Sequence, residues 1–372
     1  MLTGKRTQAD VSLFAALSLM IMENCMREIT WKKEIIGQMH RCYSVQTACV
    51  DGKQMLLAAS EAEKGGMAAY SADAPYECTW ISRENGGTMS IVNIPGASGV
   101  LYVGRKFYPH FEAAGSDVIC CRKTENGWEE TVVLRQPYLH RFDVFQVGDK
   151  RVFVGCSLCG SKRFQDDWSD PGAIYVGYLQ EDPAEPFSLK PILKGVLKNH
   201  GYWRGRWQGK EAGFIAAENG VYVFTPGEAL TECTCVRILD QPVSEVAMWD
   251  FDADGVDEMA IISPMHGNQV SVLHADGDGG YREVYRCPLD LEFCHALWAG
   301  AFCGVPTILC GARRREKQLF CITYSDGGYS TAVIDTQVGS ANVCVYSHAG
   351  EQRILSANNG CHEVAIYTAK TE

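Results

Sequence analysis

Seven short units of the same kind follow one another along most of this 372-residue chain. From Trp31 onward, runs of β-branched and aromatic residues alternate with turns that contain Gly, Asp and Asn, and no helical periodicity is sustained. In each unit an extended run ends in a short turn that leads into a new apolar run. These new runs begin near His40, Thr88, His140, His200, Ser244, His295 and Asn342. The spacing fits one four-stranded blade per unit and predicts an all-β fold, a seven-bladed β-propeller.

The two ends of the chain complement each other. The clearest unit has four extended runs, from inner to outer strand, at residues 243–251, 258–263, 268–274 and 281–287. The last unit supplies only three, and the missing outer run stands at the other end, at residues 29–36. Pairing the ends in one blade would close the ring and remove open strand edges. We therefore predict a propeller over residues 29–372 and a short helical appendage over residues 1–28.

Composition argues against two classes of partner. The formal net charge is −11 and no Lys/Arg-rich run could follow phosphates, so we expect no nucleic-acid partner. An apolar stretch over residues 11–22 follows Lys5 and Arg6, but it is too short to span a bilayer and has Asp10 at its edge. We therefore expect no membrane partner. The seventeen cysteines are scattered through strand-like runs, which is typical of reduced thiols. We expect a cytoplasmic protein, with a signal peptide over residues 5–25 as the alternative.

Propeller topology places many polar residues on one rim. An inner strand begins at the face where the second strand ends, so the starts of inner strands share that face with the turns between second and third strands. Six of the nine histidines fall there. Imidazole is the commonest protein ligand for borderline divalent metals. We predict that three or four histidines bind one transition metal (Mn, Zn or Co), from the set His140, His200, His266 and His295.

Other residues of the same rim could handle a substrate. By the same topological argument the candidate catalytic residues are His40, His110, Lys162, Asp167, Tyr202, Arg313 and Arg314. Arginine is the natural bidentate partner of a carboxylate, so we expect Arg313 or Arg314 to hold a substrate anion. A histidine, tyrosine or lysine of this set would take the proton, and Asp167 would serve as an acid or hydrogen-bond acceptor.

One turn carries a different ligand pattern. In the segment DFDADGVDE, acidic residues stand at alternate positions and Gly255 supplies a sharp turn; the candidate ligands are Asp250, Asp252, Asp254 and Glu258. Hard cations need such a run of oxygen ligands. The segment resembles the calcium loop of FG-GAP or VCBS-type propeller repeats, although only one blade keeps the loop intact. The resemblance implies a structural calcium ion on the face opposite the histidine rim.

The residue types on the rim favour one kind of reaction. No GxSxG, HExxH, glycine-rich phosphate loop or dinucleotide fingerprint occurs, whereas His, Arg and Lys suit proton abstraction next to a carbonyl or carboxylate. We predict a metal-assisted carbohydrate lyase or dehydratase that acts by β-elimination on a small keto-sugar, uronate or glycoside. This layout is similar in architecture to propeller-fold polysaccharide lyases and to the aldos-2-ulose dehydratase propeller.

Two alternatives stay open. A non-catalytic propeller could bind a sugar or a protein on its rim. A glycoside hydrolase would need two carboxylates that face each other across the channel.

Overall fold

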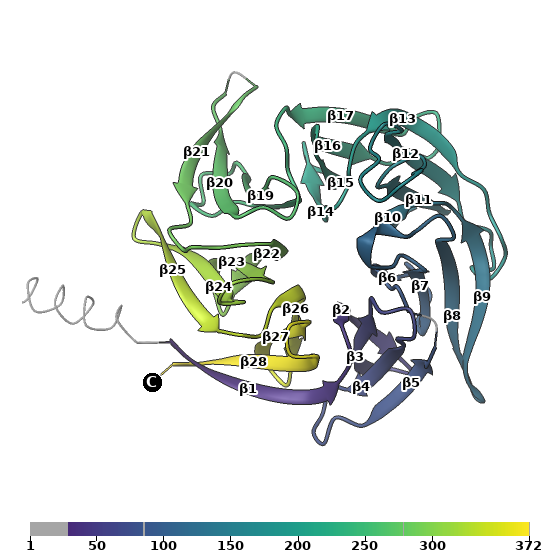
Figure 1. The fold of residues 1–372 in the computed structure, drawn as a ribbon, viewed down its shortest axis with the longest axis horizontal. Coiled ribbons are helices and arrows are strands. Elements are labelled where there is room, and N and C mark those ends of the chain that lie inside the picture. Colours follow the sequence, from purple (N-terminus) through teal and green to yellow (C-terminus); the bar gives the residue numbers. More distant parts are fainter. Residues whose placement is uncertain (1–28, 85, 278, 372) are drawn as a thin grey trace, which may run out of the picture.

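The computed structural model describes residues 29–371 except residues 85 and 278. Seven four-stranded antiparallel sheets are arranged around a common central axis, as Figure 1 shows in a view down the ring. The predicted all-β, seven-bladed propeller is therefore confirmed. The helical appendage predicted over residues 1–28 lies outside the described residues.

Each blade runs from an inner strand at the channel to an outer strand at the circumference. The first four blades contain, in this order, β2 (Cys42–Val50), β3 (Lys53–Ser60), β4 (Met67–Ser71) and β5 (Cys78–Ser82); β6 (Ser90–Asn93), β7 (Val100–Arg105), β8 (Asp117–Thr124) and β9 (Gly127–Arg135); β10 (Leu139–Val147), β11 (Lys150–Ser157), β12 (Gly172–Tyr178) and β13 (Lys190–Val196); β14 (Tyr202–Trp207), β15 (Lys210–Ala217), β16 (Gly220–Thr225) and β17 (Thr234–Leu239). A 3-10 turn, η1 (Pro109–Phe111), lies between β7 and β8.

The other three blades complete the ring. They contain β18 (Glu245–Trp249), β19 (Glu258–Ser263), β20 (Gln269–Ala275) and β21 (Tyr281–Arg286); β22 (Cys294–Phe302), β23 (Val305–Ala312), β24 (Leu319–Ser325) and β25 (Gly328–Asp335); β26 (Ser340–His348), β27 (Glu351–Asn358), β28 (Glu363–Thr371) and β1 (Ile29–Gln38).

The two ends of the chain pair in the last blade, as predicted. Strand β1 lies antiparallel to β28, with Thr30 opposite Lys370 and Gln38 opposite Glu363. The indole ring of Trp31 stacks against Phe302 of the neighbouring blade, with ring centroids 5.8 Å apart. Strand β1 therefore closes the ring by hydrogen bonding and also contributes to the packing between two blades.

The core lies between the blades and has no single centre. Strand faces carry small and branched apolar side chains that interlock with those of the next blade; one such cluster joins the fifth and sixth blades through Ala247, Ile262, Ile308 and Phe320. Such a ring of packed sheets holds the inner strands rigidly, and the start of each inner strand is consequently a fixed position at the channel mouth.

The cysteines and the length of the helices bear on two further expectations from the sequence. The sixteen cysteines of the described residues form no disulfide with one another, and most are buried or partly buried. Among the described residues, no helix has the length and apolar character needed to cross a membrane.

Candidate functional site

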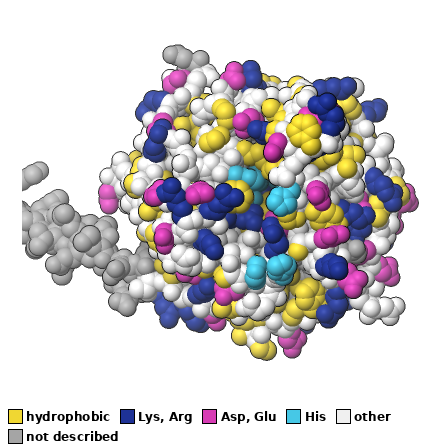
Figure 2. All heavy atoms as spheres, in the orientation of Figure 1, with side chains coloured by type: hydrophobic (Ala, Val, Ile, Leu, Met, Phe, Trp, Pro, Cys, Tyr) yellow, Lys and Arg dark blue, Asp and Glu magenta, His cyan; other side chains and the backbone are white. Residues whose placement is uncertain are grey.

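Four histidines, one from each of four consecutive blades, meet at one mouth of the channel. His140 lies in β10, His200 directly precedes β14, His295 lies in β22, and His266 stands in the turn between β19 and β20. All four line one cavity of about 350 Å³. Figure 2 shows histidine side chains near the centre of this face with Lys and Arg beside them. Residues up to 155 positions apart in the chain thus share one cavity, because ring closure brings the blades to a common axis.

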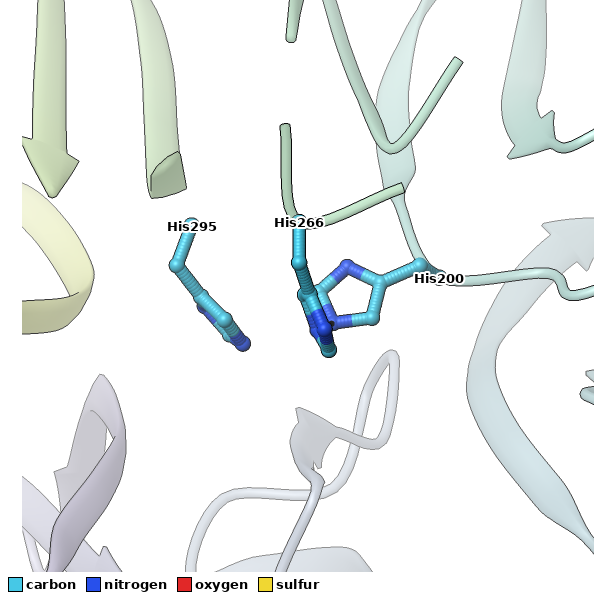
Figure 3. A group of neighbouring side chains, drawn as sticks. All are labelled: His200, His266 and His295. Atoms are coloured by element: carbon cyan, nitrogen blue, oxygen red, sulfur yellow. Dashed lines mark hydrogen bonds between the residues drawn. The ribbon is translucent and has the colours of Figure 1, made fainter. Parts of the chain in front are cut away.

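Three of these imidazoles are close enough to bind one metal ion. His200, His266 and His295 each offer a ring nitrogen, and these atoms lie within 4.8 Å of one another. The Nε2 atoms of His200 and His266 are 3.0 Å apart. Figure 3 shows the three side chains entering from separate segments and converging. His140 is not part of this trio, although its ring centroid lies 4.8 Å from that of His200.

Hydrogen bonds at Nδ1 fix how two members of the trio are presented. His200 Nδ1 lies 2.5 Å from Glu245 Oε1, and His295 Nδ1 lies 2.6 Å from the carbonyl oxygen of Ala341. A neutral imidazole that donates from Nδ1 keeps a lone pair on Nε2. These two rings are therefore prepared to act as ligands through Nε2, in the way that outer carboxylates and carbonyls commonly orient metal-binding histidines.

The fourth imidazole is held in the same way. His140 Nδ1 lies 3.1 Å from the carbonyl oxygen of His200, which leaves its Nε2 as a proton acceptor. Its side chain is buried, like those of His200 and His295. His140 therefore offers a neutral base beside the trio.

The electrostatic environment keeps the four imidazoles uncharged. Burial is the main cause that lowers the pKa of His140, His200, His266 and His295 well below the ordinary value, and nearby positive groups lower it further. Burial also raises the pKa of Glu245 to about 7, against the opposing effect of Arg141. Neutral rings are the form that binds a metal ion, so at neutral pH no proton has to leave before binding.

The backbone at His266 is in an unusual conformation. Its φ of +49° lies in the left-handed region, which costs a residue other than glycine about 1–3 kcal/mol. Gly267 follows, where an added Cβ would come within 2.3 Å of the Ser263 carbonyl oxygen. This tight turn after β19 brings the ring of His266 over the mouth of the channel, where it contacts His200.

A carboxylate missed by the sequence analysis organises the arginines of the cavity. Glu61 Oε1 accepts hydrogen bonds from Arg41 Nη2 at 2.8 Å, from Arg313 Nη2 at 2.7 Å and from Asn359 Nδ2 at 3.1 Å. Arg313 is mostly buried, whereas Arg314 is largely exposed and pairs with Glu292 at 3.2 Å. Of the two predicted anion-binding arginines, Arg313 is consequently the one held in place within the cavity.

Tyr43 is a second residue that the sequence analysis missed. Its hydroxyl oxygen lies 3.2 Å from His295 Nε2, and its ring faces the guanidinium groups of Arg141 and Arg313, each 5.8 Å from the ring centroid. Burial is the main cause that raises its pKa to about 12. Tyr43 therefore remains protonated at neutral pH and can donate a hydrogen bond into the cavity.

The structure places four other predicted residues away from the trio. His40 is exposed at the edge of the rim beside His362, with ring centroids 4.7 Å apart. Lys162 Nζ donates to the carbonyl oxygens of Gln165 and Asp167 within its own loop. Asp167 is paired with Arg163 there, at 2.7 Å.

The fourth, Tyr202, lies below the histidines rather than beside them. Its hydroxyl donates to Asp143 at 3.0 Å and faces a separate chamber of the channel, about 480 Å³ in volume. Tyr202 stands two residues after His200, so the period of two keeps it on the same side of the strand and places it about 6–7 Å further along the channel. His110, in η1, lines the cavity at its outer edge.

The acidic loop between β18 and β19 lies at the other end of the ring, as predicted. Carboxylate oxygens of Asp250, Asp252 and Asp254 lie within 4.8 Å of one another. One oxygen each of Asp250 and Glu258 is buried without a hydrogen-bond partner among the described residues. His274, from β20, contributes a further contact, 3.1 Å from Asp254. Orphaned buried carboxylate oxygens in a cluster fit a hard cation.

Comparison with known proteins supports the fold and no more. No protein-family model matches the chain, and no curated protein matches it. A solved structure from Bacteroides fragilis, provisionally assigned as a 6-phosphogluconolactonase, is 13% identical, with a TM-score of 0.51 over 89% of this chain and 88% of that one. One from Bacteroides uniformis with the same provisional assignment is 11% identical, with a TM-score of 0.49 over 86% and 89%. The resemblance to FG-GAP repeats thus rests on the acidic loop alone.

Proposed function

We propose that the protein is a metal-assisted carbon–oxygen lyase that acts on a carbohydrate acid or keto-sugar at the histidine-lined mouth of the channel. The observation that carries this proposal is the convergence of His200, His266 and His295 beside the Glu61-held Arg313. A metal ion there would polarise a substrate carbonyl or carboxylate and stabilise the negative charge that proton abstraction creates.

The nitrogen ligands limit which metal fits. Three neutral imidazoles suit zinc, manganese or cobalt better than calcium or magnesium, which prefer oxygen ligands. In tetrahedral zinc sites with Zn–N bonds of about 2.0–2.1 Å, two nitrogens lie about 3.3 Å apart. The observed 3.0 Å between the Nε2 atoms of His200 and His266 is close to that spacing.

The remaining residues supply binding and proton transfer. Arg313 would hold the substrate carboxylate through Nη1 and Nε, since the hydrogen bonds that orient its guanidinium, to Glu61 and Asn359, both come from Nη2. His140 Nε2 would accept the proton from the carbon next to the carboxylate or carbonyl, the electron pair left on that carbon would form the new double bond, and the C–O bond to the neighbouring carbon would break. Tyr43 would donate its proton to the departing oxygen. Each transferred proton thus has a named donor and acceptor.

A glycoside hydrolase is less well supported. Such an enzyme needs two carboxylates on either side of the scissile bond. Among the described residues that line the histidine cavity, Glu61 is the one carboxylate; Glu245 lines the chamber below it, and Asp167 is engaged within its own loop. The cavity therefore has imidazoles where a hydrolase would have its second carboxylate.

Elimination leaves a product that hydrolysis does not. We expect the zinc-, manganese- or cobalt-loaded protein to convert a uronide into an unsaturated sugar that absorbs in the near ultraviolet, and His140→Gln to lose at least about 100-fold of the rate, the contribution typical of a general base. His40→Gln, which changes an exposed histidine of the same rim, is the matched control. Release of a reducing sugar without new absorbance would contradict the lyase proposal.

The acidic loop is proposed to bind calcium as a structural ion. We expect about 10 mM calcium to raise the thermal midpoint by roughly 2–4 °C, as binding to the folded state alone would do. Asp252→Asn removes one exposed ligand and should abolish this increase. Asp326→Asn, in the exposed turn between β24 and β25, makes the same charge change elsewhere and should preserve it. An equal calcium response in both variants would contradict the site.

A further inference from the structure

A second cavity opens beside the histidine cavity, under the long loop between β11 and β12. It has a volume of about 480 Å³. Four residues line both cavities: Tyr108, His110, Phe111 and Gln165. The two cavities therefore adjoin and share part of their wall. We call the second cavity the side pocket.

Phe111 is the link between the side pocket and the trio. Its ring lies nearly parallel to His266, with an interplanar angle of 13° and centroids 6.3 Å apart, and it meets Trp168 edge-on at 5.3 Å. Both His110 and Phe111 have positive φ values, +64° and +62°. These two consecutive residues place the aromatic ring at the junction of the two cavities.

The walls of the side pocket are aromatic. Tyr108, Phe111, Tyr138 and Phe164 all line it. Phe164, at the tip of the long loop, is 62% exposed, which is unusual for so large an apolar side chain. A flat apolar ligand group would cover this ring and stack against the others. Trp168 does not line the pocket; Lys162 Nζ lies 3.3 Å from its ring centroid and 5.6 Å from that of Phe111.

The positively charged groups that line the side pocket are already paired within the protein. Lys106 pairs with Asp117 at 2.6 Å, Arg163 pairs with Asp167 at 2.7 Å, and Lys162 donates to two backbone carbonyls. A phosphate or a second carboxylate would have to compete with these partners. The pocket is therefore better matched to an uncharged aromatic group than to an anion.

We propose that the side pocket binds an aromatic aglycone, so that the substrate is an aryl glycoside of a sugar acid with its sugar at the histidine trio and its aryl group under the β11–β12 loop. The sugar half of this inference rests on the proposed function. The aryl half rests on the aromatic walls of the side pocket and on the wall that it shares with the histidine cavity.

Binding of two related uronides tests the inference. Calorimetric titration of the full-length, zinc-loaded protein would compare methyl β-D-glucuronide with 4-nitrophenyl β-D-glucuronide. We expect the aryl compound to bind at least about tenfold more tightly, the gain typical of a well-placed aromatic contact. Phe164→Ala should remove most of this gain and leave the affinity for the methyl compound unchanged. Val236→Ala, which shortens another exposed apolar side chain on β17, should preserve the gain.

Three results would overturn the inference: equal affinities for the two compounds, a full aryl gain in Phe164→Ala, or no binding of either glucuronide. A parallel zinc titration of the same protein separates this inference from the proposed function. Normal zinc binding with no aryl gain removes the side-pocket inference only. No zinc binding at all removes the metal centre on which the proposed function depends.

Discussion

The variant His200→Ala is expected to lose high-affinity binding of zinc, manganese or cobalt while keeping its fold. His200 is the central member of the trio: its ring centroid lies 4.6 Å from those of both His266 and His295, which are 5.5 Å from each other. Two imidazoles would remain, and a metal site with two of three protein ligands is weak. Changes to outer partners of metal ligands alone cost about 10–100-fold in affinity, so loss of a ligand should cost at least about 100-fold. Calorimetry and metal analysis after dialysis measure this directly.

A graded series makes the His200 result specific. Glu245→Gln keeps His200 as a metal ligand but weakens the hydrogen bond that orients its ring. We expect an intermediate loss of about 10–100-fold in metal affinity. His40→Ala removes an exposed histidine that contacts His362 and none of the trio, so it should bind metal like the unaltered protein. If His200→Ala bound metal normally, or if His40→Ala lost binding as well, the trio would not be the metal site.

Removing β1 is the change with the largest expected effect on stability. Strand β1 pairs with β28 over most of its length, and Trp31 and Ile36 pack into two clusters between blades. Without β1, the edge of β28 would be open and both clusters would lose an apolar side chain. Because the total stability of a folded domain is only about 5–15 kcal/mol, a chain that begins at Met39 should fail to fold cooperatively.

The comparison that isolates this effect uses a chain that begins at Ile29. Denaturant unfolding followed by circular dichroism should give a cooperative transition for the chain from Ile29 and none, or one at much lower denaturant, for the chain from Met39. Equal midpoints would show that ring closure by β1 is not required for stability.

The fold could be predicted because its signals are local and repeated. Short apolar runs between turn residues recur seven times, and an extended run at residues 29–36 supplies the missing outer strand of the last blade. The meeting of His140, His200, His266 and His295 at one mouth of the channel also followed, since it depends on strand order alone. Which three of these four histidines form the trio depends on the direction of each side chain, and strand order alone does not predict that direction.

The partners of the trio were harder to predict. Glu61 stands in a turn between second and third strands, so the rule that found Arg313 could also have found it, but a single glutamate after Ser60 carries no signal of its own. Glu245 and Tyr202 begin equivalent inner strands, β18 and β14, yet only Glu245 reaches a histidine. Lys162 donates to the carbonyl oxygen of Asp167, and the Asp167 carboxylate accepts from the backbone of Arg163. These hydrogen bonds within one loop depend on how the long turn folds back on itself, which the sequence does not indicate.

The central claim is that imidazoles from three consecutive blades form one metal site at the channel mouth. Anomalous X-ray diffraction from crystals of the zinc-loaded protein tests it most directly. We predict a strong peak about 2.0–2.1 Å from one ring nitrogen each of His200, His266 and His295, with Glu245 still bound to His200. A zinc peak elsewhere with none among these three rings, or rings that point away from one another, would contradict the claim.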